Sequence, residues 1–288
     1  NEIMYGEDAP FYRSLFKSMG YSDHELDHRP LIGIANTWNT CVPGHFNLNQ
    51  VNEFVKKGIY SAGGTAVEFG TIGCCDGVAQ GHIGMNYILP SREIICNSVE
   101  VMVQAHRLDG IVLLASCDKI VPGMLMAAAR LDIPAIVCVG GPMLGGIEFD
   151  GRKSDLTSID EAKGMCAAGK IAECEYKALE NTACPSCGSC SFLGTANSMC
   201  CVSEALGMSL PGSALIPAPY GERLRSSFAA GEAIVNLVMK GITARQVITK
   251  ESIRNAIKVT MAICGSTNAV LHLSAIANEA ELDMNVVE

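Results

Sequence analysis

The stretch Gly110-Ile-Val-Leu-Leu-Ala-Ser116, followed at once by Cys117-Asp118-Lys119, decides the fold. A run of apolar or small residues with branched side chains is typical of a strand that is buried on both faces, the kind found in parallel sheets. The three polar residues that follow mark the point where this strand ends. The stretch therefore predicts a buried parallel strand with reactive side chains at its carboxyl end.

Short apolar stretches and helical segments alternate along the first half of the chain, and Ser91 is expected to cap one of the helices. Strands and helices joined by short connections are typical of a parallel sheet with right-handed crossovers. We therefore expect an α/β fold, a three-layer α/β/α arrangement with a largely parallel sheet, followed by a mainly helical region from residue 226. The candidate strands cover residues 31–35, 65–72, 110–116 and 135–139, and the candidate helices cover 48–59, 91–106 and 122–130.

The composition indicates a large buried core. The 288 residues are 49% hydrophobic and only 18% charged, which excludes a disordered chain. The formal charge is −9 and no run of Lys or Arg occurs, so nucleic acid is not an expected partner. No apolar stretch approaches the roughly 20 residues that span a bilayer, and residues 1–10 lack the layout of a signal peptide. We expect a cytoplasmic protein that has no membrane partner.

Fourteen cysteines require an explanation. A disulfide framework is typical of short secreted domains, and this chain is neither short nor evidently secreted. Cys96, Cys138 and Cys264 lie in apolar or helical runs and are expected to be small buried hydrophobic residues. Abundant free thiols fit a reducing compartment. The cysteines that carry chemistry must be identified by their neighbours.

The triplet Cys117-Asp118-Lys119 is the first candidate site. A thiolate suits iron or zinc, a carboxylate suits magnesium, and a lysine offers a positive charge or a nucleophile. Asp76 follows the candidate strand at 65–72, and the carboxyl ends of parallel strands share one edge, where ligands bind. We expect the Asp76 and Asp118 carboxylates to converge there, with Lys119 beside them. The alternative is that both segments are ordinary polar turns.

Three histidines are considered as further candidate ligands. His82, six residues after Asp76, could join that carboxylate in binding a hard cation. His45 and His106 are expected to be hydrogen-bonded structural residues.

The stretch Cys184-Pro-Ser-Cys187-Gly-Ser-Cys190 has the cysteine spacing of an iron–sulfur or zinc site. A ferredoxin-like carrier would need a fourth cysteine followed by proline, which is missing after Cys190. Zinc is the weaker alternative because no histidine pair is nearby. An iron–sulfur electron-transfer protein and a non-catalytic metal-dependent binding domain remain as hypotheses from other functional classes.

Taken in order, several stretches resemble the dihydroxy-acid dehydratase/6-phosphogluconate dehydratase family. The resemblance covers nearly the whole chain and implies that residues 1–288 are the amino-terminal, cluster- and metal-binding domain of a longer two-domain dehydratase, with the carboxy-terminal domain absent from this sequence. The matching stretches are residues 36–45 (NTWNTCVPGH), 76–82 (DGVAQGH), 89–93 (LPSRE), 117–124 (CDKIVPGM), 184–190 (CPSCGSC), 195–199 (TANSM) and 265–268 (GSTN).

The family resemblance also implies two cofactors. Cys117 and Cys190 would bind an iron–sulfur cluster, either [2Fe–2S] or [4Fe–4S]. Asp76, Asp118 and Lys119 would bind Mg²⁺, with Lys119 carrying a carbamate that also gives it a catalytic role. An amine that captures carbon dioxide becomes an anionic oxygen ligand, which suits a hard cation.

The resemblance assigns no third cluster cysteine in this sequence. In one branch of the family it occupies the position of Gly44. Cys41 or Cys187 could replace it, although neither matches the family pattern, so the resemblance leaves only two thiolates assigned.

The chemistry implied by the resemblance is that of a hydro-lyase, loss of water from a 2,3-dihydroxy carboxylic acid to give a 2-keto acid. Magnesium would stabilise the enolate, and an iron with an open position would take the 3-hydroxyl as a Lewis acid. The second domain would supply a serine base and a further carboxylate. The stretch from Trp38 to His45 favours the branched-chain amino-acid biosynthesis branch, with a sugar-acid or 6-phosphogluconate dehydratase as the alternative. A homodimer acting on a small-molecule substrate is expected.

Overall fold

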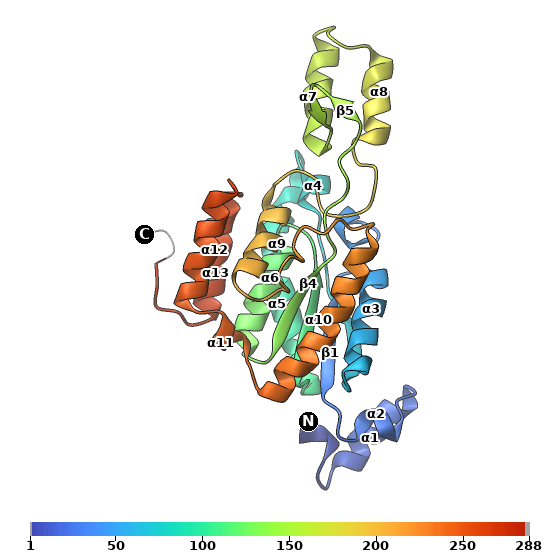
Figure 1. Ribbon diagram of the computed structural model, residues 1–288, viewed down its shortest axis with the longest axis vertical. Coiled ribbons are helices and arrows are strands. Elements are labelled where there is room, and N and C mark those ends of the chain that lie inside the picture. The colour runs from blue at the N-terminus through green and yellow to red at the C-terminus, as the bar shows by residue number, and fades with distance from the viewer. Residues whose placement is uncertain (1, 286–288) are drawn as a thin grey trace.

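A parallel four-stranded sheet forms the centre of the molecule, as seen in a computed structural model that describes residues 2–285 (Figure 1). The strand order is β2-β1-β3-β4, and all three neighbouring pairs are parallel. The four candidate strands are confirmed within two residues at each end. The strands are β1 (Leu31–Asn36), β2 (Thr65–Gly70), β3 (Gly110–Ala115) and β4 (Ala135–Val139).

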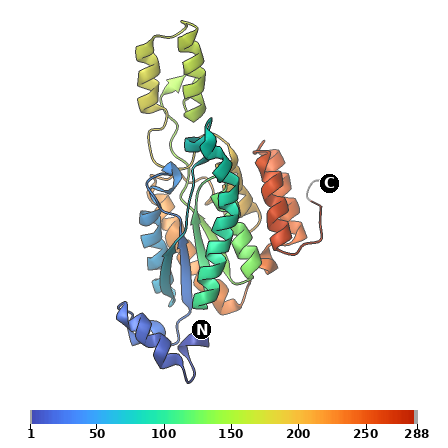
Figure 2. The same cartoon turned by 180° about the vertical axis from the view of Figure 1, so that it is seen from behind.

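Helices cover both faces of this sheet, which confirms the predicted three-layer α/β/α arrangement (Figures 1 and 2). On one face lie α3 (Leu48–Ser61) and α10 (Gly221–Lys240), and on the other lie α5 (Ile88–His106) and α6 (Ile120–Leu131).

Neighbouring residues of β3 point to opposite faces of the sheet. Val112 and Leu114 pack towards α3 and α10, whereas Ile111, Leu113 and Ala115 pack towards α5 and α6. Every residue of β3 is buried. The uninterrupted apolar run in the sequence therefore reflects burial on both faces.

The helix α10 is part of the three-layer arrangement. The sequence placed most of it in the helical region predicted from residue 226. Helix α10 lies against α3 so closely that a Cβ atom on Gly58 would be 2.0 Å from the Phe228 carbonyl oxygen. A Cβ on Gly231 would likewise be 2.2 Å from the Val55 carbonyl oxygen. Glycine at these two positions lets the helix backbones touch and closes one face of the sheet.

The remaining helical region, which the sequence predicted, lies outside α6. It comprises α9 (Thr195–Ala205), α11 (Ala244–Val247), α12 (Lys250–Ala262) and α13 (Asn268–Glu279). Within residues 2–285, no helix is both long enough and apolar enough to cross a membrane.

Two peripheral segments extend beyond the three layers. The first, at the amino-terminal end, contains η1 (Glu2–Met4), α1 (Ala9–Ser18) and α2 (Asp23–Leu26). The second projects from the opposite end of the sheet and packs around its own small apolar cluster. It contains β5 (Glu148–Phe149), β6 (Arg152–Lys153), α7 (Leu156–Ala167) and α8 (Glu173–Thr182).

Two local predictions were wrong. Ser91 does not cap α5, because the helix begins at Ile88 and accommodates Pro90 in its first turn, where a missing N–H costs little. The Ser91 hydroxyl instead donates to the Ile88 carbonyl oxygen at 2.6 Å. Cys264 is exposed, since it follows the end of α12 with a left-handed backbone (φ 52°), whereas Cys96 and Cys138 are buried as predicted.

The order of connections places a switch point between β1 and β3. The chain leaves the carboxyl end of β1 through α3 on one face to reach β2, and it leaves the carboxyl end of β3 through α6 on the other face to reach β4. The two connections therefore diverge at the carboxyl ends of β1 and β3. In open parallel sheets, ligands bind at such a topological switch point.

Candidate metal and cluster site

Cys117, Asp118 and Lys119 lie at this switch point, in the turn between β3 and α6. The Cys117 carbonyl oxygen accepts hydrogen bonds from the amides of Ile120 and Val121 at 3.1 and 3.2 Å, which tightens the turn. Cys117 and Asp118 are each only 5% exposed. The triplet is buried between a strand and a helix. It is therefore not the ordinary solvated turn that the sequence left open as an alternative.

Asp76, the first residue of α4 (Asp76–Ala79), meets the triplet from the loop after β2. Its Oδ1 accepts from the Cys117 thiol at 3.5 Å, and its carboxyl group lies close enough to that of Asp118 to affect its acidity. The Lys119 ammonium donates to Asp118 Oδ1. The structure thus brings Asp76, Asp118 and Lys119 together, as strand ends on one edge of the sheet predict.

The two carboxyl groups differ in acidity. Burial, together with the neighbouring Asp118, raises the pKa of Asp76 to about 6. Burial also acts to raise the pKa of Asp118, but contacts with His272, Asp76 and Lys119 outweigh it and hold that pKa well below its usual value. Two carboxylates at short range repel each other, so the ionised Asp118 favours the protonated form of Asp76. A divalent cation bound between them would favour the ionised form of both.

His272 and Arg92 complete the charged cluster. Arg92 belongs to the family stretch at residues 89–93, whereas His272 was not a candidate from the sequence. His272, on α13, is fully buried, and its Nε2 lies 3.8 Å from Asp118 Oδ1. Arg92 Nη1 lies 3.2 Å from His272 Nδ1. Since a guanidinium can only donate, Nδ1 accepts and the proton of the neutral imidazole sits on Nε2, facing Asp118. A lone histidine in an apolar helix was the only signal in the sequence.

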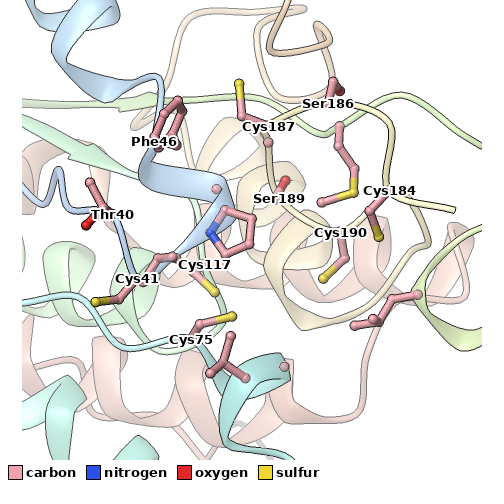
Figure 3. A pocket seen from close by; sticks show the side chains of 18 residues that line it. Thr40, Cys41, Phe46, Cys75, Cys117, Cys184, Ser186, Cys187, Ser189 and Cys190 are labelled. Atoms are coloured by element: carbon pink, nitrogen blue, oxygen red, sulfur yellow. The ribbon is translucent and has the colours of Figure 1, made fainter. Parts of the chain in front are cut away.

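Six cysteines line a cavity of about 470 Å³ next to these carboxyl groups. In the close view, the sulfur atoms of Cys75, Cys117 and Cys190 point towards a common region, whereas those of Cys41 and Cys187 point away from it (Figure 3). The sixth, Cys184, lies beside Cys190. The two thiols that the sequence predicted as cluster ligands, Cys117 and Cys190, therefore face the same space.

Cys75 is a candidate ligand that the sequence did not identify. Its thiol, a carboxylate oxygen of Asp76 and the Cys117 thiol all lie within 4.8 Å of one another, so these groups could hold a metal ion. A hydrogen bond from Cys117 lowers the pKa of Cys75 to about 7, and the same pairing, with burial, raises the pKa of Cys117. The sequence alone does not indicate whether the Cys74 thiol, the Cys75 thiol or neither faces the site.

Backbone contacts fix the loop that carries Cys184, Cys187 and Cys190. The Gly188 amide donates to the Pro43 carbonyl oxygen at 3.0 Å, and the Ser189 amide donates to Gly141 at 3.0 Å. Gly188 has φ 138°, and a Cβ there would lie 2.2 Å from the Met143 amide nitrogen. Only glycine therefore allows the loop to lie against the chain that follows β4.

Comparison with known proteins identifies the family. Residues 29–288 match the family model described as dihydroxy-acid/6-phosphogluconate dehydratase N-terminal. The chain belongs to this dehydratase family.

Several relatives named dihydroxy-acid dehydratase are similar over nearly the whole chain. The one from Caldanaerobacter subterraneus is 57% identical over 282 residues, which are 98% of this chain and 50% of that relative. The one from Pyrococcus furiosus is 55% identical over 280 residues, 97% of this chain and 50% of its own. A Clostridium pasteurianum sequence is 54% identical over 97% of this chain and 96% of its own length. The chain thus spans about half the length of the first two relatives.

Asn197 joins the two family stretches at residues 184–190 and 195–199. It was not a candidate site residue from the sequence. Its amide nitrogen donates to the Cys190 carbonyl oxygen at 2.6 Å, and its Oδ1 accepts from the Ser189 hydroxyl at 2.8 Å. Asn197 is 3% exposed. The buried side chain therefore fixes the backbone that carries the Cys190 thiol.

The family stretch Thr195–Met199 also contacts another one, Gly265–Asn268, although the two are far apart in sequence. The Thr195 and Ser266 hydroxyl groups are 2.9 Å apart, and the Asn268 side chain donates to the Thr195 hydroxyl at 3.0 Å. The Ser266 amide donates to Ser198 Oγ at 2.9 Å. These contacts join the start of α9 to the start of α13, the helix that carries His272.

The three candidate histidines from the sequence all make hydrogen bonds. His82, which is exposed, bonds locally through Nε2 to the Val78 carbonyl oxygen at 2.8 Å and through Nδ1 to the Gly84 amide at 3.0 Å. Both of its ring nitrogens are therefore used within its own turn. His106 Nδ1 bonds to the Met102 carbonyl oxygen at 2.8 Å, and His45 Nδ1 to Thr37 at 2.8 Å. The structural interpretation of His45 and His106 is confirmed.

His45 should make the protein less stable in mild acid. Burial lowers the pKa of this fully buried imidazole to about 4, whereas an unfolded chain takes up the proton below about 6.5. Its contribution to the free energy of unfolding is present above pH 6.5 and is lost as the pH falls towards 4. Between pH 7 and pH 5 the loss should be about 2 kcal/mol. Urea unfolding of wild type and His45→Gln at both pH values measures it.

In this comparison, groups common to both proteins cancel, so the stability difference between wild type and His45→Gln should shrink at pH 5. His106→Gln is the control, because its imidazole is exposed at the end of α5. A wild-type advantage over His45→Gln that is the same at pH 7 and pH 5 would show that His45 does not cause the acid sensitivity.

Proposed function

We propose that residues 1–288 form the cluster- and Mg²⁺-binding part of a hydro-lyase that converts a 2,3-dihydroxy carboxylic acid into a 2-keto acid. One observation carries the proposal: a cavity lined with thiols adjoins a buried carboxyl pair at the switch point of a parallel sheet. Soft thiolates select iron–sulfur clusters, whereas carboxylates select magnesium. Two different kinds of metal centre therefore fit side by side.

The thiol side of the cavity fits an iron–sulfur cluster better than a structural zinc ion. Cys117 and Cys190 face the same space from different segments, and the turn before α6 and Asn197 hold their backbones. No histidine is among the residues that line the cavity, all of which belong to the described part of the chain.

The carboxyl side of the site fits magnesium. Contacts with Lys119 and His272 favour the ionised form of Asp118, and a bound cation would favour the ionised form of Asp76. Lys119 is only 11% exposed in its side chain and reaches the Asp118 carboxylate. As a carbamate, Lys119 would add a third anionic oxygen donor at the same place, which is how we propose that it takes part in catalysis.

When bound, the cluster would supply a Lewis acid for the departing 3-hydroxyl and magnesium would stabilise negative charge on the enolate. The chain itself would contribute position and exclusion of water. Asp76 lies within 4.8 Å of the Cys117 thiol, so a substrate held at the carboxyl pair would present its 3-hydroxyl to the thiol-lined side of the cavity.

The base for the C2 proton is assigned to the part of the protein outside this chain. Ser266 lies in the family stretch at residues 265–268, and its hydroxyl is already engaged with Thr195 and with the Asn268 amide, at 2.9 and 3.3 Å. Ser266 therefore organises the start of α13 rather than abstracting a proton.

The proposed substrate is a branched-chain dihydroxy acid, 2,3-dihydroxy-3-methylbutanoate or its ethyl-branched homologue. Relatives that are similar over nearly the whole chain are named dihydroxy-acid dehydratase. The residues that line the cavity, all within residues 2–285, include no lysine or arginine to bind a substrate phosphate. This composition favours a substrate without phosphate over 6-phosphogluconate.

The test is an assay of the full-length protein, purified without oxygen, against both branched-chain dihydroxy acids, gluconate and 6-phosphogluconate. We expect formation of 2-keto acid from the branched-chain substrates, with kcat/KM at least tenfold above that for the sugar acids. Preferential turnover of a sugar acid would overturn the substrate assignment. A reversible redox couple without any dehydration would instead support an electron-transfer protein.

A further inference from the structure

We propose that Cys75 is the third cysteine ligand of the iron–sulfur cluster, alongside Cys117 and Cys190. This inference rests on the proposed function, because it assumes that a cluster binds in the thiol-lined cavity. Cys75 lies in the loop after β2. The only other metal ligand proposed from this loop is Asp76, which is assigned to magnesium.

Proximity is the first argument. The Cys75 and Cys117 sulfur atoms lie within 4.8 Å of each other, a separation that neighbouring cluster ligands can span with small side-chain rotations. Cys75 lines the same cavity as Cys190, and all three sulfur atoms point towards the same region (Figure 3). The three thiols come from three separate segments, after β2, after β3 and before α9. They therefore enclose a space from different sides.

A fixed backbone is the second argument. The Cys75 carbonyl oxygen accepts from the Ala79 amide at 3.1 Å, so Cys75 begins the turn of α4. Earlier in the same loop, the Thr71 amide donates to the Asn36 carbonyl oxygen at 3.1 Å, and the Asn39 side chain donates to Gly73 at 3.3 Å. The loop is thus attached to the segment that follows β1, which forms another wall of the cavity.

The other candidates for the third ligand are less suitable. Position 44 is glycine in this chain and supplies no thiol. The Cys41 and Cys187 sulfur atoms point away from the Cys117 thiol. Cys184 is exposed and belongs to the loop that follows α8.

Protection from alkylation tests the assignment without a mutation. The full-length protein is reconstituted anaerobically with iron and sulfide, treated with iodoacetamide before or after removal of the cluster by a chelator, and analysed by peptide mass spectrometry. We expect Cys75, Cys117 and Cys190 to react at least tenfold less in the loaded protein than in the stripped protein. The exposed Cys41 should react equally in both. Protection of Cys184 with a freely reactive Cys75 would overturn the proposal.

Variants give an independent measurement. Cys75→Ala should lower the iron and sulfide content of the reconstituted protein at least fivefold, whereas Cys74→Ala, the matched neighbour, should retain the wild-type content. Circular dichroism of the cluster-free proteins checks that both variants fold. If wild type binds a cluster and Cys75→Ala binds the same amount, the Cys75 assignment fails while the proposed function stands. If wild type binds no cluster, both fail.

Discussion

Cys117→Ser and Cys190→Ser should each abolish the visible absorption of the cluster after anaerobic reconstitution. Both thiols face the cavity, and each comes from a segment whose backbone is held by hydrogen bonds. A serine hydroxyl is a poor ligand for iron compared with a thiolate. Iron and sulfide analysis together with the absorption spectrum gives the measurement. We expect less than a tenth of the wild-type cluster in either variant.

Cys96 provides the control for these two substitutions. It is fully buried in the core with α5, and burial raises the pKa of its thiol to about 12, so it behaves as a small apolar side chain. Cys96→Ala removes one sulfur atom from the core and should lower stability by roughly 1 kcal/mol without changing the cluster. Equal loss of absorption in all three variants would mean that the spectrum reports unfolding rather than ligation.

The second large effect concerns activity: residues 1–288 alone should not dehydrate the substrate. The two longer relatives match this chain over only half of their length, and we assign the proton-abstracting base and a further magnesium ligand to the other half. General base catalysis contributes about 10²–10⁴-fold, and loss of a metal ligand adds to that loss. We expect at least a thousandfold decrease in kcat relative to the full-length enzyme.

The comparison uses fragment and full-length protein reconstituted in parallel, with their iron contents matched before the 2-keto acid is measured. Matching the cluster content separates loss of the base from loss of the cluster. Turnover by the fragment within tenfold of the intact enzyme would contradict the assignment of the base to the second half.

The strands and their helices could be predicted from sequence because each leaves a local pattern. Residues 110–115 form an apolar run because both faces of β3 are buried, and α3 shows the spacing of a helix with one buried face. The place of α10 could not be predicted in the same way. Its contact with α3 depends on Gly58 and Gly231, which are far apart in sequence and show no pattern until the two helices meet.

The residues of the candidate site also differ in whether they could be predicted from local sequence. Asp76 and the Cys117-Asp118-Lys119 triplet could be predicted to meet, because each follows a strand and parallel strands end at one edge. Cys75, Asn197 and His272 could not, because their roles depend on side-chain direction and on contacts between distant helices. Cys264 was misjudged because a cysteine at the end of a helical run has the same local sequence whether or not its side chain is buried.

The central claim is that this chain places a cluster and a divalent cation side by side, and Mn²⁺ used in place of Mg²⁺ tests it directly. The reconstituted, reduced protein is titrated with Mn²⁺ and followed by electron paramagnetic resonance. Because Asp76 lies within 4.8 Å of the Cys75 and Cys117 thiols, one bound Mn²⁺ per chain should broaden the cluster signal and speed its relaxation. Asp118→Asn should remove this effect while leaving the cluster in place. Binding of Mn²⁺ without any change in the cluster signal would contradict the claim.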